Sequence, residues 1–141
     1  MTLYVLDTDS VSFQQAGREN IIRRIEGVPV ESVHTTVITF YEQMRGRLAI
    51  VSRAKEGPEL IRAYERLHAT LCYFSLVNLL PFTSDALQHL ERLRAEKVRV
   101  GTQDLRIASI VLSVNGILVT SNRRDFDRIP GLVIEDWNTY S

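Results

Sequence analysis

The chain has 141 residues, and its 17 Lys and Arg balance its 17 Asp and Glu to a formal net charge of zero. This length favours one domain with its own hydrophobic core. Apolar residues form 45% of the chain and charged residues 24%, which excludes the disordered and low-complexity classes. The single cysteine, Cys72, excludes a disulfide framework and a cysteine-based zinc site.

The N-terminal residues lack a basic region followed by a long apolar run, and no apolar stretch approaches the roughly 18 residues of a membrane span. We therefore expect a cytoplasmic protein with no membrane association. The neutral balance argues against a simple electrostatic nucleic-acid binder. However, 15 of the 17 cations are arginine, whose planar fork suits phosphate better than the lysine ammonium does.

The first half of the chain alternates short apolar runs with helical periodicity. Residues 3–6 predict a buried strand that ends at Asp7. Residues 10–26 predict two short helices, because the weak helical pattern is interrupted at a glycine. Residues 32–36 predict a second strand, and a helix is expected over about 37–53.

The second half continues the alternation. The predicted elements are a helix that begins near Pro58, a strand at 78–82, helices capped by Ser84 and by Thr102, and strands at 117–120 and 132–135. The helix after Pro58 carries an apolar stripe of Leu60, Tyr64, Leu67 and Leu71, which is interpreted as a core face, with a dimer surface as the alternative. Gly116 is predicted to end the helix that Thr102 caps.

Short apolar strands that alternate with helices predict an α/β sandwich with a mostly parallel sheet of about five strands, flanked by helices. In such sheets, ligands bind beyond the carboxyl ends of the strands. Functional residues are therefore expected directly after strands.

Four acids occupy such positions. Asp7 follows the first strand, Glu42 lies near the start of the helix after the second strand, and Asp125 follows the fourth strand. Asp104 lies in the first turn of the helix that begins near Thr102. We expect the four carboxylates to converge on one edge of the sheet.

Clustered carboxylates repel one another, and their partial burial raises their pKa values. Mg²⁺ or Mn²⁺ relieves that repulsion, because hard cations prefer oxygen ligands, and such ions activate water beside a phosphodiester. Each acid also has a purely structural interpretation. Asp7 can cap a helix, Glu42 can be a solvated helix residue, Asp104 can interact favourably with the helix dipole in its first turn, and Asp125 can belong to an ordinary turn.

These residues carry a family resemblance that extends from Leu3 to Trp137. The segments that carry it are 4–9, 37–46, 100–108 and 118–126, followed by the tail 129–137. In this order they resemble the four acidic motifs and the C-terminal segment of the PIN-domain family, and within it the VapC-type toxins of bacterial toxin–antitoxin pairs. The resemblance implies a single PIN domain over 1–141 with a three-layer sandwich fold.

The resemblance further implies a metal-dependent endoribonuclease, the toxin component of a type II toxin–antitoxin system, which hydrolyses RNA phosphodiester bonds by metal-activated water. Asp7, Glu42, Asp104 and Asp125 are its implied catalytic and metal-binding residues, for Mg²⁺ or Mn²⁺. The implied partners are an RNA substrate, a small antitoxin of VapB type and a second copy of the chain in a homodimer.

Other residues near the acids are given supporting roles. They are Thr8, Asp9, Thr120 and Asn122. Asp9 stands where asparagine is common in the family and adds a fifth carboxylate, and Asn122 is expected to orient Asp125 or the local loop. Arg123 and Arg124 are either contacts for RNA phosphates or solvated loop arginines.

Two alternatives are kept open. The first is a PIN-like module that binds RNA or protein without cutting. The second is a phosphatase of the haloacid-dehalogenase type, with Asp7 as nucleophile, Asp9 as acid–base residue and Thr120 as the hydroxyl of the next motif. That second class needs a lysine after Asn122, and the sequence has none there.

Overall fold

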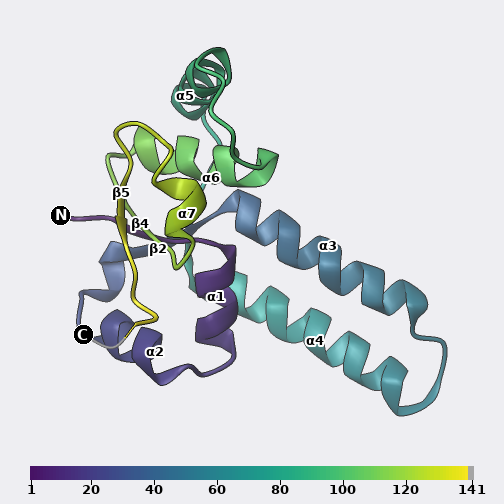
Figure 1. Ribbon diagram of the computed structural model, residues 1–141. Helices are drawn as coiled ribbons and strands as arrows, with labels where there is room; N and C mark the ends of the chain where they lie inside the picture. Colours follow the sequence, from purple (N-terminus) through teal and green to yellow (C-terminus); the bar gives the residue numbers. More distant parts are fainter. Residues whose placement is uncertain (140–141) are drawn as a thin grey trace.

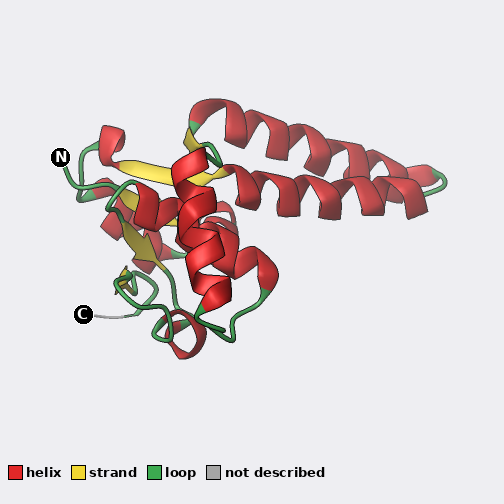
Figure 2. Cartoon of the chain, turned by 90° about the horizontal axis from the view of Figure 1, so that it is seen from above, coloured by secondary structure: helices red, strands yellow, loops and turns green. Residues whose placement is uncertain are grey.

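A computed structural model describes residues 1–139. Its centre is a five-stranded sheet in the order β3-β2-β1-β4-β5 (Figures 1 and 2). The strands are β1 (Tyr4–Leu6), β2 (Val33–Thr36), β3 (Asn78–Leu80), β4 (Ile117–Val119) and β5 (Val133–Glu135). Every neighbouring pair is parallel, with Tyr4 opposite Val33 on one side and Ile117 on the other. The predicted α/β fold with a mostly parallel sheet of about five strands is confirmed.

The helices follow the predicted alternation. They are α1 (Thr8–Gln15), α2 (Glu19–Glu26), the 3₁₀ turn η1 (Val30–Ser32), α3 (Val37–Arg53), α4 (Gly57–Leu76), α5 (Ser84–Ala95), α6 (Thr102–Ser113) and α7 (Arg123–Phe126). None of the helices within residues 1–139 is long and apolar enough to cross a membrane.

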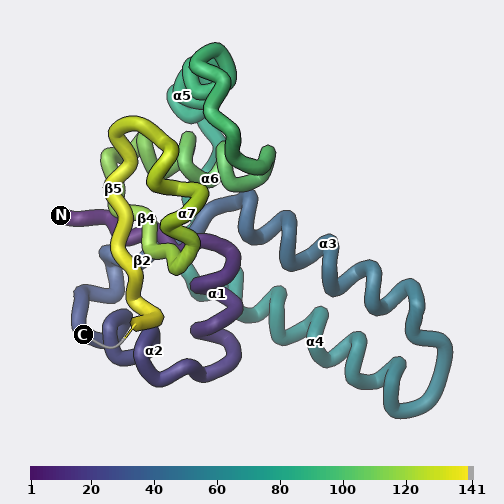
Figure 3. The backbone as a smooth tube through the Cα atoms, in the orientation of Figure 1, coloured from purple at the N-terminus to yellow at the C-terminus, as the bar shows by residue number. Residues whose placement is uncertain are grey.

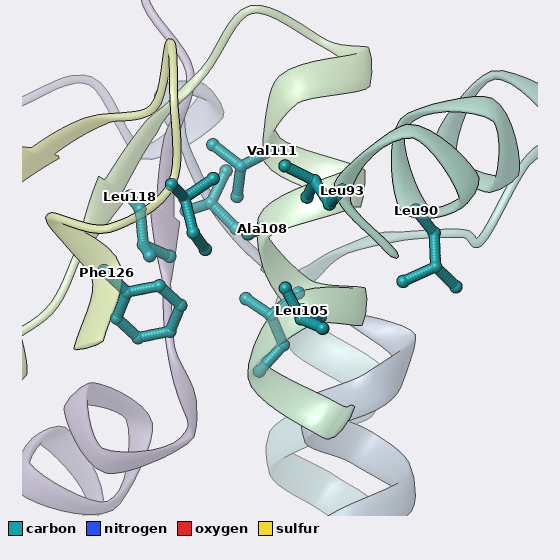
Figure 4. Close-up of a cluster of buried hydrophobic side chains, with 10 residues drawn as sticks. Leu90, Leu93, Leu105, Ala108, Val111, Leu118 and Phe126 are labelled. Carbon is teal, nitrogen blue, oxygen red and sulfur yellow. The ribbon is translucent and has the colours of Figure 1, made fainter. Parts of the chain in front are cut away.

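The sheet has an apolar cluster on each face, because side chains alternate along a strand. Val5 and Leu118 point to the face covered by α5, α6 and α7, where they pack with residues that include Phe126 (Figure 4). Leu6 and Val119, the next residues along the same strands, join the cluster on the other face with side chains of α1, α2 and α4. The result is a three-layer arrangement of helices, sheet and helices.

Helices α3 and α4 form an antiparallel pair that extends beyond the sheet (Figures 1 and 2). The prediction that the stripe on α4 is a core face is therefore wrong for its outer members. Tyr64 is 55% exposed and Leu71 is 54% exposed. Their helix packs mainly against α3, so the described chain provides nothing that covers its outer face.

The helix boundaries differ from the predicted ones in detail. Thr83, not Ser84, caps α5, since its hydroxyl accepts a hydrogen bond from the Ala86 amide. Gly101 precedes α6, and Thr102 is the first helical residue and no cap. The turn after α6 uses Asn115 at a φ of 52°, while a side chain on Gly116 would meet the Leu3 carbonyl oxygen at 3.1 Å. Gly116 is thus required by a close backbone approach and does not itself end the helix.

Candidate active site

The order in which the chain adds parallel strands to the sheet reverses between β1 and β4. From β1 the chain proceeds outward to β2 and β3, whereas β4 and β5 lie on the opposite side of β1. The carboxyl ends of β1 and β4 therefore border the crevice in which open α/β sheets bind ligands. Asp7 directly follows β1 and Thr120 directly follows β4, so both lie at this point. The trace of Figure 3 shows α1 and α7 leading away from it.

Asp7 is the most buried of the acids, with 4% of its surface exposed. Its Oδ1 accepts a hydrogen bond of 2.8 Å from the Ser10 amide, so it caps α1 as the structural interpretation expects. Burial raises the pKa of Asp7 above its usual value, although hydrogen bonds with Thr120 and Ser10 act in the opposite direction. Capping uses only one carboxylate oxygen, so it does not exclude a role in the site.

Glu42 is held in place by a threonine from another helix. The Thr8 hydroxyl, at the start of α1, donates to Glu42 Oε1 at 2.7 Å. The same hydroxyl lies 3.0 Å from Thr39 Oγ1 on α3. Thr8 thus connects the helix that follows β1 with the helix that follows β2, and it orients Glu42 toward the Asp7 side.

Asn122 orients the acid of the fourth segment. Its side-chain amide donates to Asp125 Oδ2 at 3.0 Å, and its backbone amide donates to Thr120 Oγ1 at 2.9 Å. It therefore both positions Asp125 and fixes the loop after β4, the two roles predicted for it. Arg123 and Arg124 lie exposed on the single turn of α7.

Asp104, in the first turn of α6, is influenced by the charges of the other acids. Its burial, followed by the negative charges of Asp7, Glu42, Asp125 and Asp9, raises its pKa to about 6. The charges of four acids from three different segments thus act on one carboxyl group. Asp9 is exposed, yet its charge acts on both Asp7 and Asp104.

The chemistry of this donor set fits a hard divalent cation. All donors are carboxylate oxygens, and Asp7, Glu42 and Asp125 each use one named oxygen in a hydrogen bond. No three described Asp, Glu, His or Cys side chains already surround one metal position in this conformation. Coordination therefore requires the carboxylates to move inward from their present positions.

Sequence reasoning did not single out Ser10 or Thr39. Ser10 donates its backbone amide to Asp7 and its hydroxyl to the Val119 carbonyl oxygen at 2.9 Å, which connects α1 with β4. An aspartate directly before a helix is a capping signal, and it predicts the first of these contacts whatever residue with a backbone N–H follows at position 10. The contact of Thr39 with Thr8 depends on the packing of α3 against α1, and the sequence carries no local signal for it.

The fold places this chain among α/β proteins with a parallel sheet and acidic side chains near its topological switch point. A model of the PIN domain family matches residues 4–132. The chain belongs to the PIN domain family.

Similar proteins cover almost the whole chain. The tRNA(fMet)-specific endonuclease VapC of Salmonella typhimurium is 29% identical, over 97% of this chain and 99% of the relative. Ribonuclease VapC1 of Haemophilus influenzae is 28% identical, over 96% and 98%.

Solved structures agree. The DNA-bound VapBC complex from Salmonella typhimurium contains a chain with a TM-score of 0.78 and 29% identity, over 97% of this chain and 99% of that one. A chain of VapBC2 from Rickettsia felis, at 22% identity over 96% and 99%, has a TM-score of 0.77 and supports the fold.

Proposed function

We propose that this protein is a metal-dependent endoribonuclease of the VapC type and the toxin component of a type II toxin–antitoxin system. The observation that carries the proposal is the set of acids around the carboxyl ends of β1 and β4, where burial and then the charges of four other carboxylates raise the pKa of Asp104. Its support comes from full-length relatives that are named as VapC nucleases.

The proposed cofactor is Mg²⁺ or Mn²⁺. Asp7 and Asp104 are its proposed principal ligands, and Glu42 and Asp125 complete the set. The bound ion supplies activation of water and neutralisation of charge on the phosphate. Its affinity for the site also follows from electrostatics, because a divalent cation relieves the mutual repulsion of the carboxylates.

The surrounding side chains have positioning roles in this proposal. Thr8 holds Glu42, and Asn122 holds Asp125, each by one hydrogen bond that leaves the second carboxylate oxygen available. Thr120 fixes the loop through the Asn122 amide and stabilises the ionised form of Asp7. Such support matters because ligands that are already oriented lose little freedom when they bind.

The substrate is proposed to be RNA, and a tRNA is the first one to test, since the Salmonella typhimurium relative is named as specific for tRNA(fMet). Arg123 and Arg124 lie exposed directly before Asp125 and are proposed contacts for RNA phosphates. A protein that acts on cellular RNA works in the cytoplasm, which is therefore part of the proposal.

The proposed partners are a VapB-type antitoxin and a second copy of the chain. Solved complexes of similar proteins are described as VapBC assemblies, which supports the antitoxin. The exposed apolar side chains of α4, such as Tyr64 and Leu71, are available to a protein partner. Light scattering of the purified chain measures the oligomeric state, and co-expression with any short reading frame that lies beside its gene tests for the antitoxin.

The enzymatic test uses purified protein with total tRNA in Mg²⁺, in Mn²⁺ and in EDTA. We expect discrete fragments with either ion, and none with EDTA or with the Asp104→Asn variant. Asp127→Asn is the matched control, because it removes an exposed acid at the end of α7, next to the site, and retains cleavage. RNA binding without cleavage in any ion would establish the non-cutting alternative instead. The phosphatase alternative has no support from the family match.

A further inference from the structure

A cavity lined by two arginines lies where the end of α1 meets the middle of α3 and α4. It has a volume of about 350 Å³, which is within the range of small-ligand pockets. Its lining residues are Gln15, Arg47, Arg66, Ala69, Thr70 and Tyr73. Two of them are cations, and no acid lines the cavity. Glu65, beside Arg66 in the chain, instead lines a separate surface hollow with Tyr64 and His68.

Hydrogen bonds orient Arg47 but leave part of its guanidinium available. Its Nε donates to Thr70 Oγ1 at 3.1 Å, and the Thr70 hydroxyl in turn donates to the Arg66 carbonyl oxygen at 2.8 Å. The neutral polar groups are already engaged, since Gln15 pairs with Gln43 at 2.8 and 2.9 Å and Tyr73 donates to Gln14. Within residues 1–139, the arginine N–H groups and the second amide N–H of Gln15 are thus the donors that remain for a ligand.

The cavity concentrates positive charge without a protein counterion. Burial and then the charge of Arg66 lower the pKa of Arg47. Among the described residues, ion pairs form between Arg23 and Glu19 and between Arg24 and Glu135, and neither cavity arginine takes part. Two like charges beside one cavity oppose each other, and a bound anion removes that repulsion. Guanidinium groups bind phosphate oxygens with two parallel hydrogen bonds.

The position of the cavity points to the substrate. Arg47 follows Glu42 by five residues on the same helix, which places it about 7.5 Å further along the axis of α3 and about 140° around it. Gln15 and Gln43 join α1 to α3 between these two positions. We propose that Arg47 and Arg66 bind a backbone phosphate of the RNA substrate at a position on the strand away from the cleavage site. This subsite rests on the proposed ribonuclease function.

The test measures binding of a fluorescein-labelled single-stranded oligouridylate by anisotropy, in EDTA and over a series of salt concentrations. Arg66→Gln is the main variant, because Arg66 is exposed and its replacement leaves the Thr70 contacts unchanged. We expect about fivefold weaker binding at low salt. The slope of log K against log salt should fall in magnitude by about 0.7, the effect of one lost phosphate contact on a single strand.

Arg62→Gln is the matched control, since it removes the same charge one turn away on α4, outside the cavity. Arg47→Lys keeps the positive charge but removes the guanidinium group and its paired N–H donors. It should weaken binding less than Arg47→Gln, which removes both. In cleavage assays, Arg66→Gln should raise KM and leave kcat unchanged. Unchanged melting temperatures of the variants establish that they fold.

Three results would overturn the subsite: Arg66→Gln binds like the wild type, Arg62→Gln loses as much affinity, or the wild type binds no oligouridylate. The proposed ribonuclease function survives each of them as long as the wild type cleaves tRNA in Mg²⁺. The proposal would also be overturned if Arg66→Gln lost binding to an acidic peptide such as oligoglutamate but bound RNA like the wild type. That result would assign the cavity to a protein carboxylate.

Discussion

Replacement of Asp104 by asparagine should stabilise the metal-free protein while it removes the proposed activity. The ionised Asp104 carboxylate is partly buried and faces the charges of Asp7, Glu42, Asp125 and Asp9, so folding raises its pKa from the ordinary 3.8 to about 6. A group with a raised pKa in the folded state binds its proton more tightly there than in the unfolded chain. Its contribution to stability is therefore full below about pH 4 and is lost as the pH rises through about 6.

The size of this loss follows from the shift. A difference of about 2 pKa units corresponds to about 3 kcal/mol at most. Because Asp104 is only about half buried, solvent screening reduces this to about 1 to 2 kcal/mol. For a domain of this length, each kcal/mol shifts the melting temperature by about 3 °C, so Asp104→Asn should melt about 3 to 6 °C higher than the wild type above pH 7.

The assay is thermal unfolding in EDTA at about pH 4 and about pH 8, followed by far-UV circular dichroism. The gain in melting temperature should appear at the higher pH and nearly vanish at the lower pH, where the carboxyl group is protonated in the folded wild type. Addition of Mg²⁺ should then raise the melting temperature of the wild type and have a smaller effect on the variant, because binding to the folded state stabilises it. An equal gain at both pH values would refute the reasoning, since the effect would then not come from the charge of Asp104.

Three further predictions concern another acid of the site, the threonine that holds Glu42, and the core beneath α7. Asp7→Asn should lower cleavage more than about 100-fold without a lower melting temperature, because asparagine also caps helices well; an active variant in a tRNA cleavage assay would contradict the role of Asp7. Thr8→Val should lower kcat about tenfold, since Glu42 loses the 2.7 Å hydrogen bond, while Thr8→Ser should restore most of the rate; equal rates for both variants would show that the hydroxyl is dispensable. Phe126→Ala should cost about 3 to 5 kcal/mol in urea unfolding, because Phe126 is 1% exposed in the cluster beneath α7, and a loss below about 1 kcal/mol would mean that the site loop does not depend on this contact.

The sequence by itself determined the order of strands and helices and the identity of the acids. The apolar run at 3–6 stops at Asp7, and a polar residue directly after a buried strand lies at the sheet edge by necessity. The strand predicted at 117–120 includes Thr120, whereas β4 ends at Val119 and leaves Thr120 directly after it. The functional prediction followed from chain order and from the family resemblance. Both depend on residue type and local pattern, which can be recognised without knowing how the helices pack.

Tertiary structure decided which side chains touch. The Thr8–Glu42 and Thr8–Thr39 contacts join residues more than 30 positions apart, and they exist because α1 packs against α3. No local periodicity encodes such a contact.

The paired helices α3 and α4 show the same limit. The apolar stripe of α4 predicts a core face. However, this helix extends beyond the sheet, so no second layer covers Tyr64 or Leu71. The register of this pair also brings Arg47 and Arg66 to one cavity. Local sequence thus determined at which ends of strands and helices the carboxylates lie. Only the packing of helices from distant segments determined which side chains hold them and why Arg47 and Arg66 line one cavity.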